Sequence, residues 1–87
     1  MLELYQFEGC PYCQKVREKL SELGVSYVIH NPRLGKSADH RVTNRTTYDE
    51  LVEMGGLDQV PYLVDTRRNT SLYESDDIVE YLETHYA

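Results

Sequence analysis

The sequence predicts an α/β protein in which helices pack on a four-stranded mixed sheet. Short β-prone runs alternate with apolar residues at helical spacing, in the order strand–helix–strand, short helix, two strands, helix. A strand–helix–strand unit of this length implies a parallel pair with a right-handed crossover, and the later two strands form an antiparallel hairpin. The chain has 87 residues, enough for one core, so a single domain spanning residues 1–87 is expected.

The first part of the chain contains the strand–helix–strand unit. Residues 2–7 are β-prone, and Gly9 ends this first strand. The next apolar residues recur at helical spacing: Cys13, Val16, Leu20 and Leu23. Gly24 fits the C-terminal end of that helix, and residues 25–30 form the second predicted strand.

The middle of the chain is a polar segment, residues 31–47, followed by a short helix. Polar segments of this length in compact domains are usually functional or mobile. This one is basic, with a single acid, Asp39, against Arg33, Lys36, Arg41 and Arg45. Thr47 and Glu50 have the spacing of a capping box, which predicts a helix over residues 48–54 that ends at the glycine pair 55–56.

The last part of the chain predicts a hairpin and a helix. Strands at residues 62–65 and 71–73 flank a turn, and Ser75 can cap a helix over residues 76–86. Asp76 and Asp77 would lie at the positive end of its dipole. The complete order, βαβ–α–ββα, is that of the thioredoxin fold.

The composition excludes several classes of protein. A net charge of −6 argues against nucleic-acid binding, which needs a cationic face. The sequence contains no apolar run of about 18 residues and no signal-like start, so no membrane association and a cytoplasmic location are expected. In a reducing compartment two cysteines are catalytic or metal-binding rather than structural. Two cysteines and three scattered histidines make a closed zinc site improbable.

The two cysteines form a Cys-x-x-Cys motif at residues 10–13, between the first strand and the first helix. The thiolate is the reactive form of cysteine, and Cys10 would lie beside the unpaired N–H groups of the helix start. Cys13 lies on the apolar stripe. We therefore expect Cys10 to be the exposed attacking thiol and Cys13 the buried resolving thiol. The motif alone is also compatible with half of a zinc knuckle or an inert pair, but its position between strand and helix favours redox chemistry.

Three motifs together resemble a known family: Cys-Pro-Tyr-Cys at residues 10–13, Val60-Pro61, and Glu-Ser-Asp-Asp-Ile at residues 74–78. In this order and spacing they resemble glutaredoxins, most closely those that share their fold with the N-terminal domain of glutathione S-transferases. The resemblance covers nearly the whole chain. The first motif is highly specific to glutaredoxins, and the Glu-Ser pair is more typical of the transferases.

The resemblance implies a binding site for glutathione. The Val60–Pro61 bond would be cis and lie beside Cys10, and the backbone of Val60 would pair with the cysteinyl part of glutathione. The γ-glutamyl end would be held by Glu74, Ser75 and Asp76, and Tyr12 could line the groove. Helix N–H groups suit a carboxylate, and acidic side chains suit an ammonium group. Alternatively, Ser75 is only a cap and the acids only complement the helix dipole.

The sequence departs from the family pattern in two places. Many glutaredoxins carry a lysine three residues before the first cysteine, where this chain has Phe7. The basic segment could replace that lysine by reaching the substrate. In addition, the sequence ends at Ala87 without the helical second domain that binds the electrophile in a transferase.

The resemblance implies a glutathione-dependent thiol–disulfide oxidoreductase with catalytic residues Cys10 and Cys13. No tightly bound cofactor or metal is expected; glutathione or γ-glutamylcysteine would be the co-substrate. Disulfide-containing or glutathionylated proteins would be the partners, and the protein is expected to be a monomer. Two alternatives remain open. One is an iron–sulfur cluster carrier, which Pro11 disfavours because glycine is usual there in cluster-binding relatives. The other is a non-catalytic glutathione-binding domain.

Overall fold

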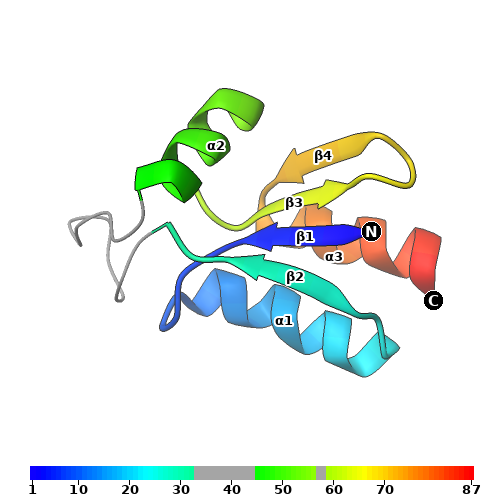
Figure 1. Cartoon of the computed structure of the whole chain (residues 1–87). Coiled ribbons are helices and arrows are strands. Elements are labelled where there is room, and N and C mark those ends of the chain that lie inside the picture. The colour runs from blue at the N-terminus through cyan, green and yellow to red at the C-terminus, as the bar shows by residue number, and fades with distance from the viewer. Residues whose placement is uncertain (33–44, 57–58) are drawn as a thin grey trace.

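The computed structural model describes residues 1–32, 45–56 and 59–87 (Figure 1). The elements in chain order are β1 (Leu2–Tyr5), α1 (Pro11–Leu23), β2 (Tyr27–His30), α2 (Arg45–Gly55), β3 (Tyr62–Asp65), β4 (Thr70–Tyr73) and α3 (Ser75–Tyr86). The strands form one four-stranded sheet in the order β2-β1-β3-β4. The β1–β2 pair is parallel, and β3 is antiparallel to both of its neighbours. The predicted mixed sheet and thioredoxin fold are confirmed.

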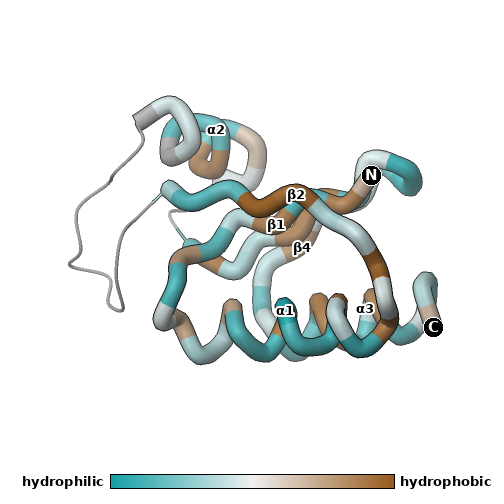
Figure 2. The backbone as a smooth tube through the Cα atoms, turned by 60° about the horizontal axis from the view of Figure 1, so that its bottom comes forward, coloured by the Kyte–Doolittle hydropathy of each residue, from teal (hydrophilic) through white to brown (hydrophobic). Residues whose placement is uncertain are grey.

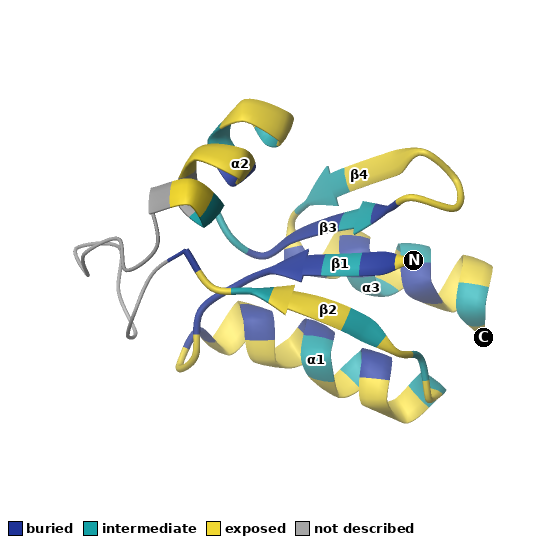
Figure 3. Cartoon of the chain, in the orientation of Figure 1, coloured by how far each residue is buried: buried dark blue, intermediate teal, exposed yellow. Residues whose placement is uncertain are grey.

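The helices cover both faces of the sheet. Figure 2 shows α1 and α3 beneath the sheet and α2 on the opposite side. The main core lies between the sheet and the α1–α3 pair, and consists of Leu2, Leu4, Val16, Leu20, Leu63, Ile78 and Leu82. A second cluster under α2 contains Tyr5, Leu51 and Tyr62. Buried apolar residues of α1 and α3 face the same core, and the outer faces of the two helices are exposed (Figure 3).

Two helix starts differ from the predictions. The helix α2 begins at Arg45, so Thr47 lies inside its first turn and the capping box predicted there is wrong. The helix α3 begins at Ser75, and its N-cap is Glu74, which makes no side-chain cap hydrogen bond. Ser75 is therefore not the cap. In α2 the two residues before the predicted cap are already helical, and in α3 the predicted cap residue is itself the first helical residue. Side-chain preference alone did not indicate either start.

The turn between β4 and α3 has an unusual backbone. Glu74 has φ 70° and ψ 116°, a region that side-chain-bearing residues rarely adopt. Strained backbone of this kind is often found where a ligand is held. The turn places the start of α3 next to the start of α1.

None of the helices in the described part of the chain is long and apolar enough to cross a membrane.

Candidate active site

The two cysteines lie at the start of α1, where the backbone holds them in fixed relation. Cys10 is the N-cap, with extended backbone angles of φ −76° and ψ 115°. Its Sγ accepts a hydrogen bond of 3.3 Å from the backbone N–H of Cys13. Pro11 occupies the first turn, where the N–H that it lacks would have no helical partner. Both thiols are free, and a negative charge on the sulfur of Cys10 would face a donor group.

The expected contrast in exposure between the two thiols is wrong. Cys10 is only 4% exposed and Cys13 is 0% exposed. The reason is packing: Phe7 is buried with both cysteines, and Val60 covers the same cluster. A phenylalanine at position 7 thus closes over the motif, in the position where many glutaredoxins have a lysine.

The two thiols nevertheless differ chemically. Burial raises the pKa of the Cys13 thiol, and its hydrogen bond with the side chain of Cys10 raises that pKa further. The nearby charge of Arg17 opposes the shift but is the weakest of these influences. Cys13 is therefore held as a neutral thiol that can donate a hydrogen bond to a charged neighbour.

A pocket of about 320 Å³ adjoins the cysteine cluster. It is lined by Tyr12, Gln59, Val60, Pro61, Glu74, Ser75 and Asp76. All six residues that the resemblance implied for substrate binding therefore come together, although they belong to segments far apart in the sequence. The Val60–Pro61 bond is cis, as expected. Val60 both lines the pocket and packs against the cysteine cluster, so it connects the pocket to Cys10.

Two residues that the sequence analysis did not select belong to this region. The side-chain amide of Gln59 donates a hydrogen bond of 3.1 Å to Oε1 of Glu74. The ammonium of Lys15, on α1, forms an ion pair with Asp76, on α3. Gln59 could have been noticed because it directly precedes the Val-Pro motif. The partner of Lys15 could not, because that contact depends on how the two helices pack.

A polar network around the buried side chain of Gln6 adjoins the cysteine-bearing loop. Gln6 is 1% exposed, accepts a hydrogen bond from Arg17 and donates one to Asn31. Arg17 also pairs with Glu8 at 3.5 Å. The network joins the end of β1, the middle of α1 and the end of β2, so it braces both sides of the loop that leads to Cys10. A polar residue at the end of a predicted strand was the only sign of it in the sequence.

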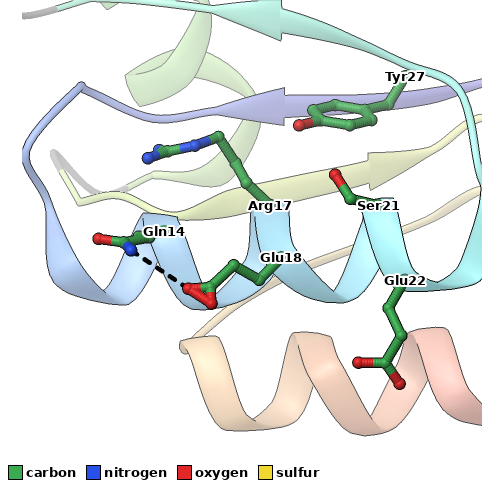
Figure 4. A pocket seen from close by; sticks show the side chains of 6 residues that line it. All are labelled: Gln14, Arg17, Glu18, Ser21, Glu22 and Tyr27. Carbon is green, nitrogen blue, oxygen red and sulfur yellow. Dashed lines mark hydrogen bonds between the residues drawn. The ribbon is translucent and has the colours of Figure 1, made fainter.

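A second cavity, of about 590 Å³, lies between α1 and β2 (Figure 4). It is lined by Gln14, Arg17, Glu18, Ser21, Glu22 and Tyr27. None of the predicted site residues is among them. Gln14 donates a hydrogen bond of 3.2 Å to Glu18 across one helical turn, drawn as a dashed line in Figure 4. This cavity is separate from the thiol pocket.

The predicted role of the basic segment stays a prediction. Arg33, Lys36, Arg41 and the side chain of Arg45 lie outside the described residues. Within the described ranges, no group of three or more Cys, His, Asp and Glu side chains is placed to hold a metal ion. The ring of His30 stacks on that of Tyr5, with centroids 4.5 Å apart, and its Nε2 lies 2.8 Å from Oε1 of Glu3.

Comparison with known proteins identifies the family to which this chain belongs. The family model described as "Glutathione S-transferase, N-terminal domain" matches residues 4–87. No curated protein matches the chain. A glutathione S-transferase from the Antarctic clam Laternula elliptica is 25% identical, with a TM-score of 0.73 over 98% of this chain and 35% of that one. The chain thus spans about a third of that structure's length.

Two further structures share the fold. A delta-class glutathione transferase from Nilaparvata lugens is 22% identical, with a TM-score of 0.74 over 100% of this chain and 37% of its own. Glutaredoxin 2 from Salmonella typhimurium, solved in complex with glutathione, is 24% identical, with a TM-score of 0.70 over 95% of this chain and 33% of its own. The same fold therefore occurs in glutathione transferases and in a glutaredoxin.

Proposed function

The chain belongs to the family of the glutathione S-transferase N-terminal domain, and on that premise we propose that it is a thiol–disulfide oxidoreductase. It uses glutathione or a similar small thiol such as γ-glutamylcysteine. Its substrates are mixed disulfides of that thiol and disulfides of proteins. The observation that carries the proposal is the hydrogen bond from the Cys13 N–H to Sγ of Cys10 at the start of α1.

That hydrogen bond supports a nucleophilic role for Cys10. A sulfur at the N-cap of a helix lies near N–H groups without helical partners and near the positive end of the helix dipole. Both favour the thiolate, which is the attacking species in disulfide exchange. Cys13, whose pKa is raised by burial, remains protonated and does not compete as the first nucleophile.

The proposed reaction begins with a disulfide between a substrate thiol and glutathione. The thiolate of Cys10 attacks the glutathione sulfur, the substrate sulfur leaves as a thiolate that takes up a proton, and Cys10 becomes joined to glutathione. A second glutathione, as its thiolate, attacks the glutathione sulfur of that adduct. Oxidised glutathione leaves, and the thiolate of Cys10 is restored. The net reaction consumes one free glutathione, releases the reduced substrate thiol and forms one molecule of oxidised glutathione.

Protein disulfides require the second cysteine. Cys10 forms a mixed disulfide with one sulfur of the substrate and releases the other as a thiolate. Cys13 then loses its proton and attacks Sγ of Cys10. The substrate leaves fully reduced, and the Cys10–Cys13 pair carries the disulfide until glutathione reduces it. The Cys13 sulfur lies close to Sγ of Cys10, because the two side chains are hydrogen-bonded to each other.

The pocket beside Val60 is the proposed site for the thiol's peptide part. The backbone of Val60 would pair with the cysteinyl residue, which places the disulfide next to Cys10. The γ-glutamyl end would lie against the start of α3, where Glu74, Ser75 and Asp76 line the pocket. Tyr12, which is 64% exposed at the edge, would cover the bound molecule.

The test is the glutathione-dependent reduction of hydroxyethyl disulfide and of a glutathionylated peptide. Cys10→Ser should abolish both activities. Cys13→Ser should retain reduction of the glutathione mixed disulfides and lose most reduction of protein disulfides. Undiminished turnover by Cys10→Ser would contradict the proposal, and the opposite behaviour of Cys13→Ser would exchange the two roles.

One observation favours a second candidate, a domain that binds glutathione without turnover. Cys10 is 4% exposed, covered by Phe7 and Val60, which restricts the approach of a bulky disulfide. If this candidate is right, the wild-type protein binds glutathione but reduces no disulfide, and Phe7→Ala opens the site to turnover. Comparison of the wild type with that variant in the hydroxyethyl disulfide assay separates the two functions.

A further inference from the structure

Phe7 contacts both cysteines, with its ring and with its backbone. The ring packs against Cys10 and Cys13, together with the uncharged side chain of Val60 from the turn before β3. The carbonyl oxygen of Phe7 accepts a hydrogen bond of 3.3 Å from the N–H of Cys10. Burial raises the pKa of the Cys13 thiol most strongly, and a hydrogen bond between its sulfur and the Phe7 backbone opposes that shift. Because only a donor to the sulfur favours the thiolate, the backbone group involved is the N–H of Phe7.

A single side chain holds the residues on either side of Phe7. The guanidinium of Arg17 donates a hydrogen bond to the side-chain oxygen of the buried Gln6 and pairs with Glu8 at 3.5 Å. Arg17 lies one turn after Cys13 on the same helix, α1. Its two contacts therefore fix the loop relative to the helix that carries the resolving thiol, and Phe7 lies between them.

Bonding of Cys10 to a substrate changes the surroundings of Cys13. After burial, the influences that raise the pKa of the Cys13 thiol come from Cys10, through its side-chain hydrogen bond and its negative charge. In a mixed disulfide the sulfur of Cys10 carries no charge and is a weak acceptor. The N–H of Phe7 and the charge of Arg17, which lower that pKa, stay in place. Cys13 therefore loses its proton most readily at the stage when it must attack.

We infer that Arg17 is a positioning residue for the resolving step: it holds the loop so that the N–H of Phe7 faces the sulfur of Cys13 while that sulfur becomes a thiolate. The inference rests on the proposed function, because it concerns how the dithiol reaction is completed. In this step Cys13 releases a proton and attacks Sγ of Cys10. The bond between Cys10 and the substrate breaks, and the substrate sulfur leaves as a thiolate that takes up a proton. One disulfide forms as another breaks, so no further oxidant or reductant takes part.

The chain offers a matched control on the same helix. Lys19 is a cation whose side chain is 18% exposed, close to the 22% of Arg17. It pairs with Glu22 at 3.2 Å and with Glu83 at 3.1 Å, which lie on α1 and α3 and not on the loop before Cys10. Removal of Lys19 changes the net charge of α1 as removal of Arg17 does, but it leaves the contacts of the loop in place.

The experiment isolates the resolving step with dithiobis(nitrobenzoic acid), an aromatic disulfide that releases a coloured thiolate. Attack by Cys10 releases one aromatic thiolate and leaves the other bonded to Cys10. This adduct is formed with excess reagent at about pH 5, where unperturbed thiols are almost fully protonated, and the excess is then removed. Rapid mixing into buffers of higher pH starts the attack by Cys13, which releases the second aromatic thiolate. The variants are Arg17→Met, Arg17→Lys and Lys19→Met, and Cys13→Ser gives the baseline.

The inference predicts a loss that is confined to the second release. In the wild type this release should have a rate that does not depend on protein concentration. Arg17→Met should slow it about fivefold to tenfold near neutral pH, as expected for a weakened hydrogen bond to a charged sulfur. The difference should disappear at alkaline pH, where Cys13 is ionised in both proteins, and the rate of adduct formation at Cys10 should be unchanged. Arg17→Lys should recover part of the rate, and Lys19→Met should match the wild type.

Three results would overturn the inference. One is a second release that Arg17→Met does not slow, and another is equal slowing at every pH, which a merely structural role would produce. The third is the same slowing by Lys19→Met. A wild type whose adduct releases no second thiolate would overturn it as well, because Cys13 would then not act as the resolving thiol.

Failure of the proposed function would look different. If Cys10 forms no adduct, both the proposed function and the inference are refuted. A wild type that releases the second thiolate but reduces no glutathione mixed disulfide would refute the proposed activity and leave the role of Arg17 intact. In an active protein, Arg17→Met should slow the reduction of a protein disulfide and leave the reduction of a glutathionylated peptide unchanged, because the latter reaction does not use Cys13.

Discussion

The hydroxyl of Tyr81 donates a hydrogen bond of 2.7 Å to Oδ2 of Asp65, which joins the end of β3 to α3. Asp65 is 0% exposed, and it is the acceptor for a group of further donors: the Tyr86 hydroxyl, the Arg68 guanidinium and the Arg67 N–H. This buried carboxylate lies away from the thiol pocket. It anchors the last helix, whose first turn forms one wall of that pocket.

Acid should weaken the fold through Asp65. Burial alone would raise the pKa of Asp65, but the hydrogen bonds that it accepts lower that pKa to about 2 from an ordinary value of 3.8. The unfolded chain therefore takes up the proton first as the pH falls. The stability that the carboxylate contributes is fully present above pH 3.8, and it is lost as the pH falls from 3.8 to about 2. The expected loss is about 2 kcal/mol.

Urea unfolding at a series of acidic pH values measures this loss. Asp65→Asn should be less stable than the wild type at neutral pH by about 2–4 kcal/mol, because two half-buried tyrosine hydroxyls and an arginine lose a buried, charged acceptor. Its stability should also fall less steeply in the same acidic range. If the two proteins show parallel curves, Asp65 is not the group responsible.

The thiol of Cys13 should be unreactive toward alkylating reagents in the native protein. Its pKa is raised by burial and by the hydrogen bond with Cys10, so the reactive thiolate is scarce at neutral pH. In a Cys10→Ser variant, iodoacetamide should leave Cys13 unlabelled under native conditions and label it after unfolding in urea. Mass spectrometry of the intact protein reads this out. Rapid native labelling would show that Cys13 is neither buried nor protonated in solution.

Loss of Arg17 should destabilise the loop that leads to Cys10. Arg17→Met removes the donor to the buried oxygen of Gln6, and a buried polar group without a partner costs about 1–3 kcal/mol. The free energy of unfolding in urea measures the effect. Lys19→Met is the control, since it breaks only exposed ion pairs and should change the stability by at most about 1 kcal/mol. Equal effects of the two substitutions would contradict the bracing role of Gln6.

Gly55 should not tolerate a side chain while Tyr73 is present. A Cβ at Gly55 would lie 1.9 Å from the hydroxyl of Tyr73 and 2.6 Å from its ring carbon Cζ. The ring is packed against Tyr62, with centroids 4.4 Å apart, so it has little freedom to withdraw. Gly55→Ala should therefore lower the free energy of unfolding by about 1–3 kcal/mol, as an overpacked site does.

The same substitution should change sign when the ring is removed. In a Tyr73→Ala background, Gly55→Ala should stabilise the protein by up to about 1 kcal/mol, because alanine is the better helix former. Urea unfolding of the four proteins of this cycle gives the coupling between the two positions. Additive effects would mean that the ring does move aside.

Much of the fold could be predicted from local pattern. The bounds of β3 were predicted at the residues observed, and α2 ends at Gly55, one residue beyond the predicted end at Met54 and within the glycine pair expected to close it. The positions of the Cys-x-x-Cys motif at a helix start and of the hairpin turn between β3 and β4 were also correct. These features depend on residues a few positions apart, which is the range over which helical spacing, strand propensity and turn residues act.

The exposure of Cys10 was predicted incorrectly for a physical reason. The position of Cys10 at a helix start indicates that its sulfur lies near backbone N–H groups. It does not indicate which side chains pack over that sulfur. Phe7 and Val60 cover Cys10 only because the loop before α1 meets the turn before β3. The starts of α2 and α3 were missed similarly, since Glu74 takes up its rare backbone angles where β4 must turn into α3.

The sequence by itself therefore determined the order of the elements, the sheet that they form and the positions of both cysteines and the pocket motifs. The tertiary structure alone decided which charges meet: Lys15 with Asp76, Gln59 with Glu74. Helix and strand formation follow from short-range geometry along the chain. Burial and charge pairing follow from which distant elements pack together, and no local pattern contains that information.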